Sequence, residues 1–91
     1  MDSIAFKEVN MGLTERLEIG TREVLADGQI HVRTDTVIER DGVEISRTYH
    51  RHVVAPGDDV SREDPSVQRI AKAEHTPAKI AAYKLATQLV Q

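Results

Sequence analysis

The chain has 91 residues, of which 12 are basic and 15 acidic, and its net charge is −3 at neutral pH. A chain of this length forms one domain with one modest core, and with no tryptophan and one phenylalanine that core must be aliphatic. The absence of cysteine excludes disulfides, thiolate metal sites and cysteine nucleophiles. The charges are intermixed and no apolar run approaches about 20 residues, so we expect neither a nucleic-acid nor a membrane partner.

Residues 1–12 show only weak alternation of apolar and polar side chains and end at a glycine. We expect an N-terminal arm or an edge strand here, which becomes ordered on a partner. Residues 13–55 contain two Asp-Gly pairs, Asp27-Gly28 and Asp41-Gly42, each between two β-rich segments. Asp-Gly favours a two-residue type I′ turn, because both central positions of that turn need a positive φ. Residues 13–55 are therefore predicted to form a three-stranded antiparallel meander.

Two-residue turns at both positions determine the register of the strands. Ile30 then faces Val53 on one side and Leu25 on the other, and the apolar side chains of the three strands share one face. One pair opposes this register, since Glu39 faces Glu44, and a β-bulge would relieve that repulsion. The predicted core face consists of Leu17, Ile19, Ile30, Ile38, Ile45 and Val53.

The C-terminal part of the chain predicts a polar loop and two helices. Pro56 ends the third strand, and residues 56–64 are polar. Asp64-Pro65 and Thr76-Pro77 each combine a capping residue with proline at the first helical position. We therefore expect helices within residues 65–91, with one or both packed on the core face. The predicted fold is α+β, a single domain in which C-terminal helices cover one face of a β-meander.

The histidines are the most suggestive polar feature. His50 and His52 are two residues apart, so their side chains point to the same face of a strand. The predicted register brings His31 opposite His52 and Arg33 opposite His50, on the face away from the core. Three imidazoles around one point are suited to zinc or iron, with His31, His50 and His52 as the ligands.

The same patch has two other interpretations. Histidine is an ordinary residue on a solvated sheet face, and no carboxylate that would orient the imidazoles is identified beside them. Alternatively, His31, Arg33, His50 and His52 form an interface that meets acidic groups of a neighbour. Of the three interpretations we favour the interface.

No motif indicates catalysis. The acidic residues Asp58 and Asp59 match no EF-hand spacing. No serine stands in a nucleophile elbow, so hydrolase chemistry has no support. We therefore expect a protein that is not an enzyme and that has no catalytic residue and no bound cofactor.

Residues 24–86, about two thirds of the chain, resemble a family of small uncharacterised proteins of tailed bacteriophages and prophages. The resemblance rests on Asp27-Gly28, on residues 36–59 with Tyr49-His50-Arg51-His52 and Pro56-Gly57-Asp58-Asp59, and on Thr76-Pro77 with Ala81-Ala82-Tyr83. It implies a phage-encoded protein from the tail or another morphogenesis region, and it transfers no functional residue.

The sequence therefore predicts a non-enzymatic structural or adaptor protein of the phage tail. We expect it to be made in the host cytoplasm and to join the virion, with other phage structural proteins and further copies of itself as partners. One alternative is a binding module stabilised by metal at the histidine cluster. A further alternative is a small intracellular phage regulator or an inhibitor of a host protein.

Overall fold

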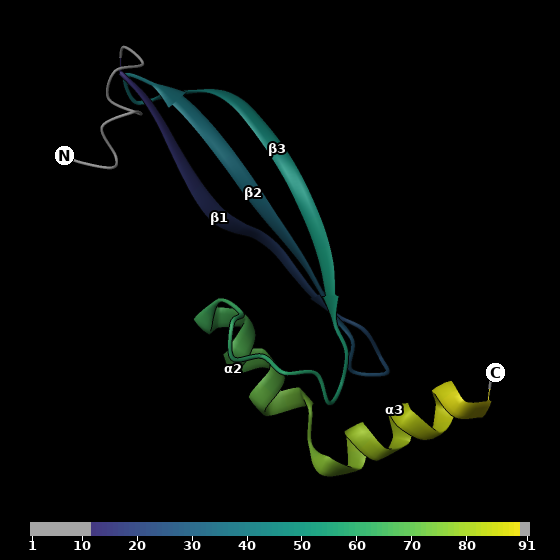
Figure 1. Ribbon diagram of the computed structural model, residues 1–91. Coiled ribbons are helices and arrows are strands. Elements are labelled where there is room, and N and C mark those ends of the chain that lie inside the picture. The colour runs from purple at the N-terminus through teal and green to yellow at the C-terminus, as the bar shows by residue number, and fades with distance from the viewer. Residues whose placement is uncertain (1–11, 90–91) are drawn as a thin grey trace.

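The computed structural model describes residues 12–89, which form a three-stranded sheet followed by two helices. The strands pair antiparallel in the order β1-β2-β3, so the predicted meander and the α+β fold are confirmed (Figure 1). The arm expected over residues 1–12 lies, apart from Gly12, outside the described residues. The elements are β1 (Leu13–Val24), β2 (Ile30–Arg40), β3 (Val43–Val54), α2 (Pro65–Glu74) and α3 (Pro77–Leu89).

The two Asp-Gly pairs form different turns. Asp41 and Gly42 both have positive φ, 52° and 86°, so the second turn is the predicted two-residue type I′ turn. At the first pair only Gly28 has positive φ, and the amide of Leu25 donates to the carbonyl of Gln29 at 2.8 Å. This is a three-residue loop with a glycine bulge. The prediction of a two-residue turn at Asp27-Gly28 is therefore wrong.

The three-residue loop and two bulges shift the register away from the predicted one. The loop pairs Ile30 with Val24 and not with Leu25. Ile30 pairs with Val54 and not with Val53, because a bulge that follows Ile38 displaces β3 by one residue. This bulge leaves Glu39 paired with Glu44, so it changes the register without separating the two carboxylates. A second bulge lies in β1 between Ile19 and Thr21. A shift of one residue moves a side chain to the other face of the sheet.

The register defines two faces that we name by their relation to α2. On the helix-side face, β2 presents Ile30, Val32, Thr34, Thr36 and Ile38. On the opposite face, which we call the outer face, β2 presents His31, Arg33, Asp35, Val37 and Glu39.

The core lies where α2 meets one end of the helix-side face. Val67 and Ala71 of α2, four residues apart and therefore on one side of the helix, pack on the sheet. Their partners from the strands are Ile30, Val32 and Val54. The predicted core was only partly right: Ile19 is half-buried, but Leu17, Ile45 and Val53 are 69%, 54% and 48% exposed.

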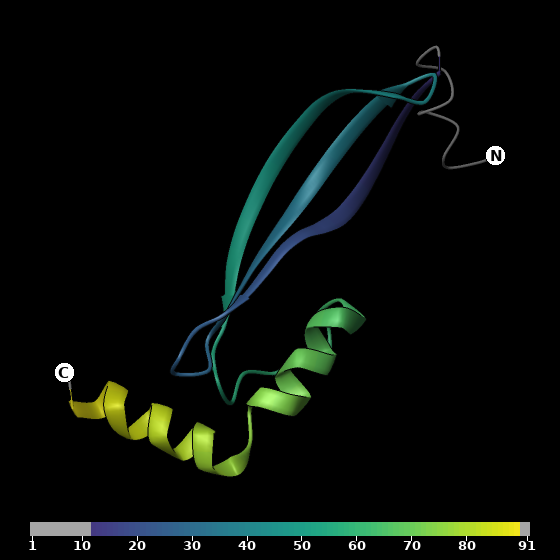
Figure 2. The ribbon, with the colours of Figure 1, turned by 180° about the vertical axis from the view of Figure 1, so that it is seen from behind.

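The two helices differ in what they contact. Asp64 caps α2 by accepting a hydrogen bond from the amide of Ser66 at 2.9 Å, as the Asp64-Pro65 motif predicts. This helix lies beside the sheet, whereas α3 extends away from it and has no buried residue (Figures 1 and 2). Neither described helix is long and apolar enough to cross a membrane. Of the two described helices, α2 is therefore the one that covers the sheet.

The molecule is elongated. Its extents are 54 × 23 × 22 Å, and its radius of gyration is 17.8 Å. A compact domain of this length has a radius of gyration of about 12 Å. The sheet extends well beyond the part that α2 covers (Figure 2).

Neighbouring valines at the end of β3 test the register. We expect Val54→Ala to lower the free energy of unfolding by about 2 kcal/mol, because Val54 is 2% exposed and its methyl groups fill the core. Val53→Ala is the matched control, and should cost at most about 0.5 kcal/mol because its side chain is on the exposed outer face. Urea unfolding followed by circular dichroism measures both values. Equal or reversed losses would contradict the register.

Candidate interaction surface

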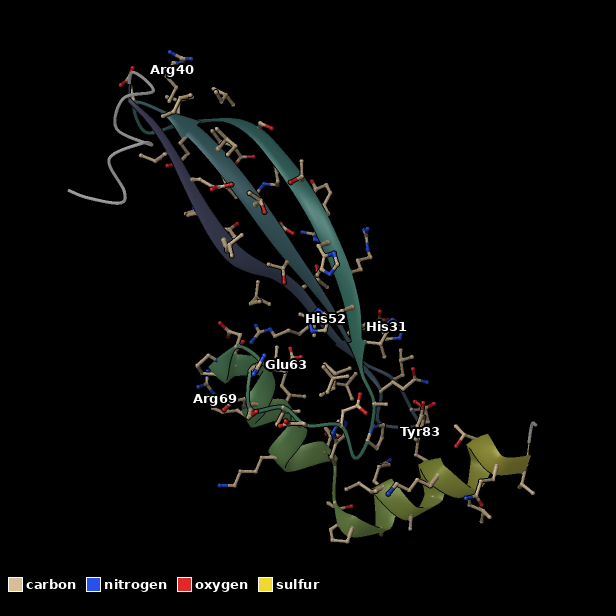
Figure 3. The ribbon with its side chains drawn as sticks, in the orientation of Figure 1. His31, Arg40, His52, Glu63, Arg69 and Tyr83 are labelled. Carbon is tan, nitrogen blue, oxygen red and sulfur yellow. The ribbon has the colours of Figure 1, made fainter. Side chains whose placement is uncertain are left out.

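The shifted register separates the residues that were predicted to cluster. His31 pairs with Val53, whereas His52 pairs with Val32, so the two imidazoles are on opposite faces of the sheet. His31 and Arg33 lie on the outer face, and His50 and His52 lie on the helix-side face. Figure 3 shows His31 and His52 on the two sides of the strands.

The predicted three-histidine metal site is not assembled. His50 and His52 remain neighbours, with ring centroids 6.3 Å apart and planes inclined by 24°. His31 is on the other face. Within residues 12–89, no group of three or more histidine or acidic side chains is arranged to hold a metal ion. The predicted ligand set fails because its members were assigned to one face by a register that is off by one residue.

A buried carboxylate is the centre of the outer face. The side chain of Asp35 on β2 is 0% exposed, although neither of the described helices covers this face. Arg33 holds it with two hydrogen bonds, Nε to Oδ1 at 2.8 Å and Nη2 to Oδ2 at 3.0 Å. Arg47 of β3 adds a third, from Nη1 to Oδ2 at 2.7 Å. Charge-assisted bonds of this kind offset the cost of burying the carboxylate.

Gly20 of β1 leaves the space that this ion pair occupies. A Cβ atom at Gly20 would stand 2.5 Å from Oδ2 of Asp35 and 2.6 Å from Nη2 of Arg33. Its φ is not in the left-handed region, so the residue is required for space and not for a turn. The bulge between Ile19 and Thr21 is the point where β1 approaches the carboxylate.

Arg47 extends the network to all three strands. Its Nη1 also donates to Glu18 of β1 at 2.8 Å, and its Nε and Nη2 donate to Glu44 at 2.9 and 2.8 Å. Arg16 pairs with both Glu18 and Glu39. We call the set of Arg16, Glu18, Arg33, Asp35, Glu39, Glu44 and Arg47 the ion-pair network.

The ion-pair network favours the ionised forms of Glu18, Asp35 and Glu44. Burial raises the pKa of Asp35, but the hydrogen bonds from Arg33 and Arg47 outweigh it and leave the pKa below its ordinary value. Hydrogen bonds from Arg47 also lower the pKa of Glu18 and of Glu44. Bonds to Glu44, Glu18 and Asp35 raise the pKa of Arg47 well above its usual range. All these groups are charged near neutral pH.

An aromatic ring lies over this network. Cζ of Arg33 is 4.6 Å from the ring centroid of Tyr49, and Cζ of Arg51 is 6.0 Å from it. Tyr49 remains 53% exposed. Beside it is an open hollow of about 320 Å³, whose lining includes His31, Arg33 and Arg51. The outer face therefore presents one tyrosine between two arginines, and Asp35 holds one of these arginines in place.

Two histidine hydrogen bonds connect the ends of α2 to β3 and to the loop between β1 and β2. Nε2 of His52 is 2.8 Å from Oε1 of Glu63, in the loop before the helix (Figure 3). At the other end of α2, Nε2 of His75 donates to the carbonyl oxygen of Gly28 at 2.7 Å. His52 therefore positions the helix, a role that the sequence analysis did not assign to it.

The sequence alone did not identify the residues that organise the outer face. The signal for Asp35 was the spacing of Arg33 and Asp35, two residues apart on a central strand and therefore on one face. A two-residue turn at Asp41-Gly42 without a bulge would pair Arg47 with Thr36 on the core face, whereas the structure pairs Arg47 with Val37 on the outer face. Nothing in the residues next to Gly20 marks it as important, since it is not in a turn. Its role depends on the contact with Asp35, which is 15 positions later in the sequence.

Comparison of the chain with family models, with curated proteins and with solved structures gives no match.

Gly20→Ala tests the close approach at Asp35. Replacing glycine with alanine in an unstrained strand usually stabilises a protein slightly, but here the added methyl group overlaps the carboxylate. We expect a loss of about 1–3 kcal/mol in the free energy of unfolding, measured with urea. In an Asp35→Ala background the same substitution should lose most of this effect, because the carboxylate is gone and the guanidinium of Arg33, which it held, is free to move aside. A stabilising effect in the wild-type background would contradict the packing.

The ion-pair network also predicts how stability depends on pH. The pKa values of Glu18, Asp35 and Glu44 are lower in the folded protein, so their contribution is complete above the ordinary carboxyl pKa. It is lost as the pH falls below about 4. We expect Arg47→Gln to flatten this acid loss of stability, because all three carboxylates lose a hydrogen bond.

Arg51→Gln is the control for this measurement. Arg51 is also on β3, and within the described residues it forms no ion pair with a carboxylate. Urea unfolding at several pH values should give it the wild-type pH dependence. Identical profiles for Arg47→Gln and the wild type would refute the role of Arg47.

Proposed function

We propose that the protein is a non-enzymatic structural or adaptor component of a bacteriophage particle, in the tail, and that it acts through protein–protein contacts. The observation that supports this proposal is the surface that the fold leaves uncovered. Among residues 12–89, no helix covers the outer face, and both β1 and β3 have an open edge. No residue of α3 is buried. Such open surfaces are suited to neighbours in an assembly.

The outer face has the composition of a contact surface. Tyrosine and arginine are enriched in protein interfaces and among the residues that dominate binding energy. Tyr49 lies against Arg33, whose guanidinium is held by Asp35, so little side-chain freedom is lost on binding. His31 and Arg33, two of the four residues of the predicted interface, belong to this surface. We infer that it is the principal contact with other proteins of the particle.

The place in a phage tail rests on the sequence resemblance described above. An elongated sheet with one polar and one partly apolar face suits a subunit that bridges neighbours. The alternative function, an intracellular phage regulator or an inhibitor of a host protein, would use the same surfaces. The location of the protein after infection, in the virion or in the host cytoplasm, therefore discriminates between a structural component and a regulator.

Mass spectrometry of purified virions tests the proposed function. We expect the polypeptide in the particles, and we expect Tyr49→Ser to reduce its incorporation at least tenfold because the centre of the contact is removed. Thr48→Ser is the matched control, since Thr48 is the adjacent exposed residue of β3 and its side chain is on the helix-side face. Absence from virions, together with capture of a host protein from infected cells, would favour the regulator instead.

A further inference from the structure

The free edge of β3 is a row of unpaired backbone groups. β3 is the last strand of the sheet, and its backbone pairs with β2 on one side only. Within residues 12–89, no hydrogen bond joins the backbone groups on its other side to another residue. In both ribbon views no other element lies along this edge (Figures 1 and 2). Such a row of N–H and C=O groups is a template for a further strand.

The edge of β3 is also regular. From Ser46 to Val54 each residue of β3 pairs with β2 without a break, because the bulge of this pair lies closer to the second turn. This segment contains no proline, glycine or lysine. Lysine, proline and bulges are the devices by which proteins prevent pairing at a sheet edge. The edge of β1 is interrupted by the bulge between Ile19 and Thr21, so β3 is the edge that is suited to accept a strand.

The charges along this edge define the chemistry of the strand that fits. Between Ser46 and Val54 there is no acidic residue, whereas Arg47 and Arg51 both lie on the outer face. Arg47 is held by three carboxylates of its own chain. Arg51 forms no ion pair within the described residues, and its guanidinium lies over the ring of Tyr49. Arg51 is therefore a cation that can pair with an acidic side chain of an added strand.

Apolar side chains flank this arginine along the strand. Tyr49 and Val53 lie two residues to either side of Arg51, on the same face, and are 53% and 48% exposed. The hollow on the outer face includes Arg51 and Val53 in its lining. In an added strand, the side chains opposite these three residues would have their Cβ atoms ~5 Å away. The matching strand therefore carries an acidic residue between two apolar residues, at alternate positions.

We propose that the edge of β3 accepts an extended segment of another protein, which pairs antiparallel with Ser46–Val54 and places an acidic side chain beside Arg51. The segment continues the meander as a fourth strand, and antiparallel pairing is slightly more stable than parallel pairing. Backbone hydrogen bonds supply the affinity, and the alternate side chains supply the specificity. This inference rests on the proposed function, because it names the type of segment by which a partner protein is bound.

Binding of a synthetic strand to the purified full chain tests the proposal. The probe is a fluorescein-labelled, amidated peptide of nine residues, one for each residue from Ser46 to Val54, with the sequence Thr-Val-Thr-Glu-Thr-Val-Thr-Thr-Thr. Fluorescence anisotropy should show saturable binding. A probe with lysine in place of glutamate should bind about five- to twentyfold more weakly, because two like charges then meet at Arg51. No saturable binding, or equal binding of the two probes, would overturn the proposal.

Backbone methylation of the probe tests the pairing itself. Two further probes carry N-methyl groups on their odd or on their even residues. Only alternate N–H groups of an added strand face its neighbour, so one of these probes should bind and the other should not. Equal binding of both would contradict an added strand.

Charge reversal at Arg51 tests the position of the acidic side chain. Arg51→Glu should reverse the preference, so that the lysine probe binds more tightly than the glutamate probe. Arg22→Glu is the matched control: Arg22 is an exposed arginine of β1, so the net charge changes equally but the wild-type preference should remain. Circular dichroism should show the wild-type fold for both variants. A wild-type preference in Arg51→Glu would refute the assigned position.

Amide hydrogen exchange, measured by NMR, locates the added strand. The outward-facing amides of residues 46–54 should exchange rapidly in the free protein, and the glutamate probe should protect them but not those of β1. Protection in the free protein at low concentration would mean that the chain covers this edge itself. Protection that develops only as the protein concentration rises would mean that a second copy covers it. Either result overturns the proposal.

The outcome is separable from that of the virion experiment. Presence of the polypeptide in virions without binding of the probe removes only this inference. Binding of the probe by a protein that is absent from virions removes the proposed place in the particle and leaves the edge of β3 as a binding site.

Discussion

The buried carboxylate of Asp35 is the constraint on which the rest of this structure depends. Within residues 12–89 a helix lies on only one face of the sheet and along part of its length, so apolar burial beneath that helix does not support the outer face. Asp35 connects β2 to β3 through Arg47, and Arg47 continues to Glu18 on β1. The ion-pair network therefore links all three strands. It also explains why Val37 is fully buried on the outer face, where the register places it between Arg16 and Arg47.

This distribution of contacts determines which surfaces are available to partners. Stabilising contacts are concentrated at the core beneath α2 and in the ion-pair network, whereas Leu17 of β1 and Leu85 and Leu89 of α3 are exposed in the described part of the chain. The outer face is polar but fixed, because Asp35 holds Arg33 against Tyr49. The described residues thus combine a polar outer face held by ion pairs with exposed leucines elsewhere on the sheet and on α3. Both properties suit a subunit of an assembly.

The histidines illustrate how far sequence reasoning extends to a candidate site. His50 and His52 share a face, as their spacing predicts, because alternation along one strand is a local property. The relation of His31 to His52 depends on the pairing of two strands, and the bulge after Ile38 reverses it. Of the predicted interface residues, two therefore lie on each face. Asp35, Arg47 and Gly20 were not identified as a site, because their importance comes from contacts across strands.

The sequence by itself determined the strands, the type I′ turn at Asp41-Gly42 and the start of α2 at Asp64-Pro65. These features depend on neighbouring residues, whose backbone preferences act over a few positions. Only the tertiary structure decided the register, the membership of the two faces and the separation of α3 from the sheet. A single extra residue in a strand exchanges its faces. Whether such a residue is accommodated depends on distant groups, as the ion pair of Asp35 beneath Gly20 shows.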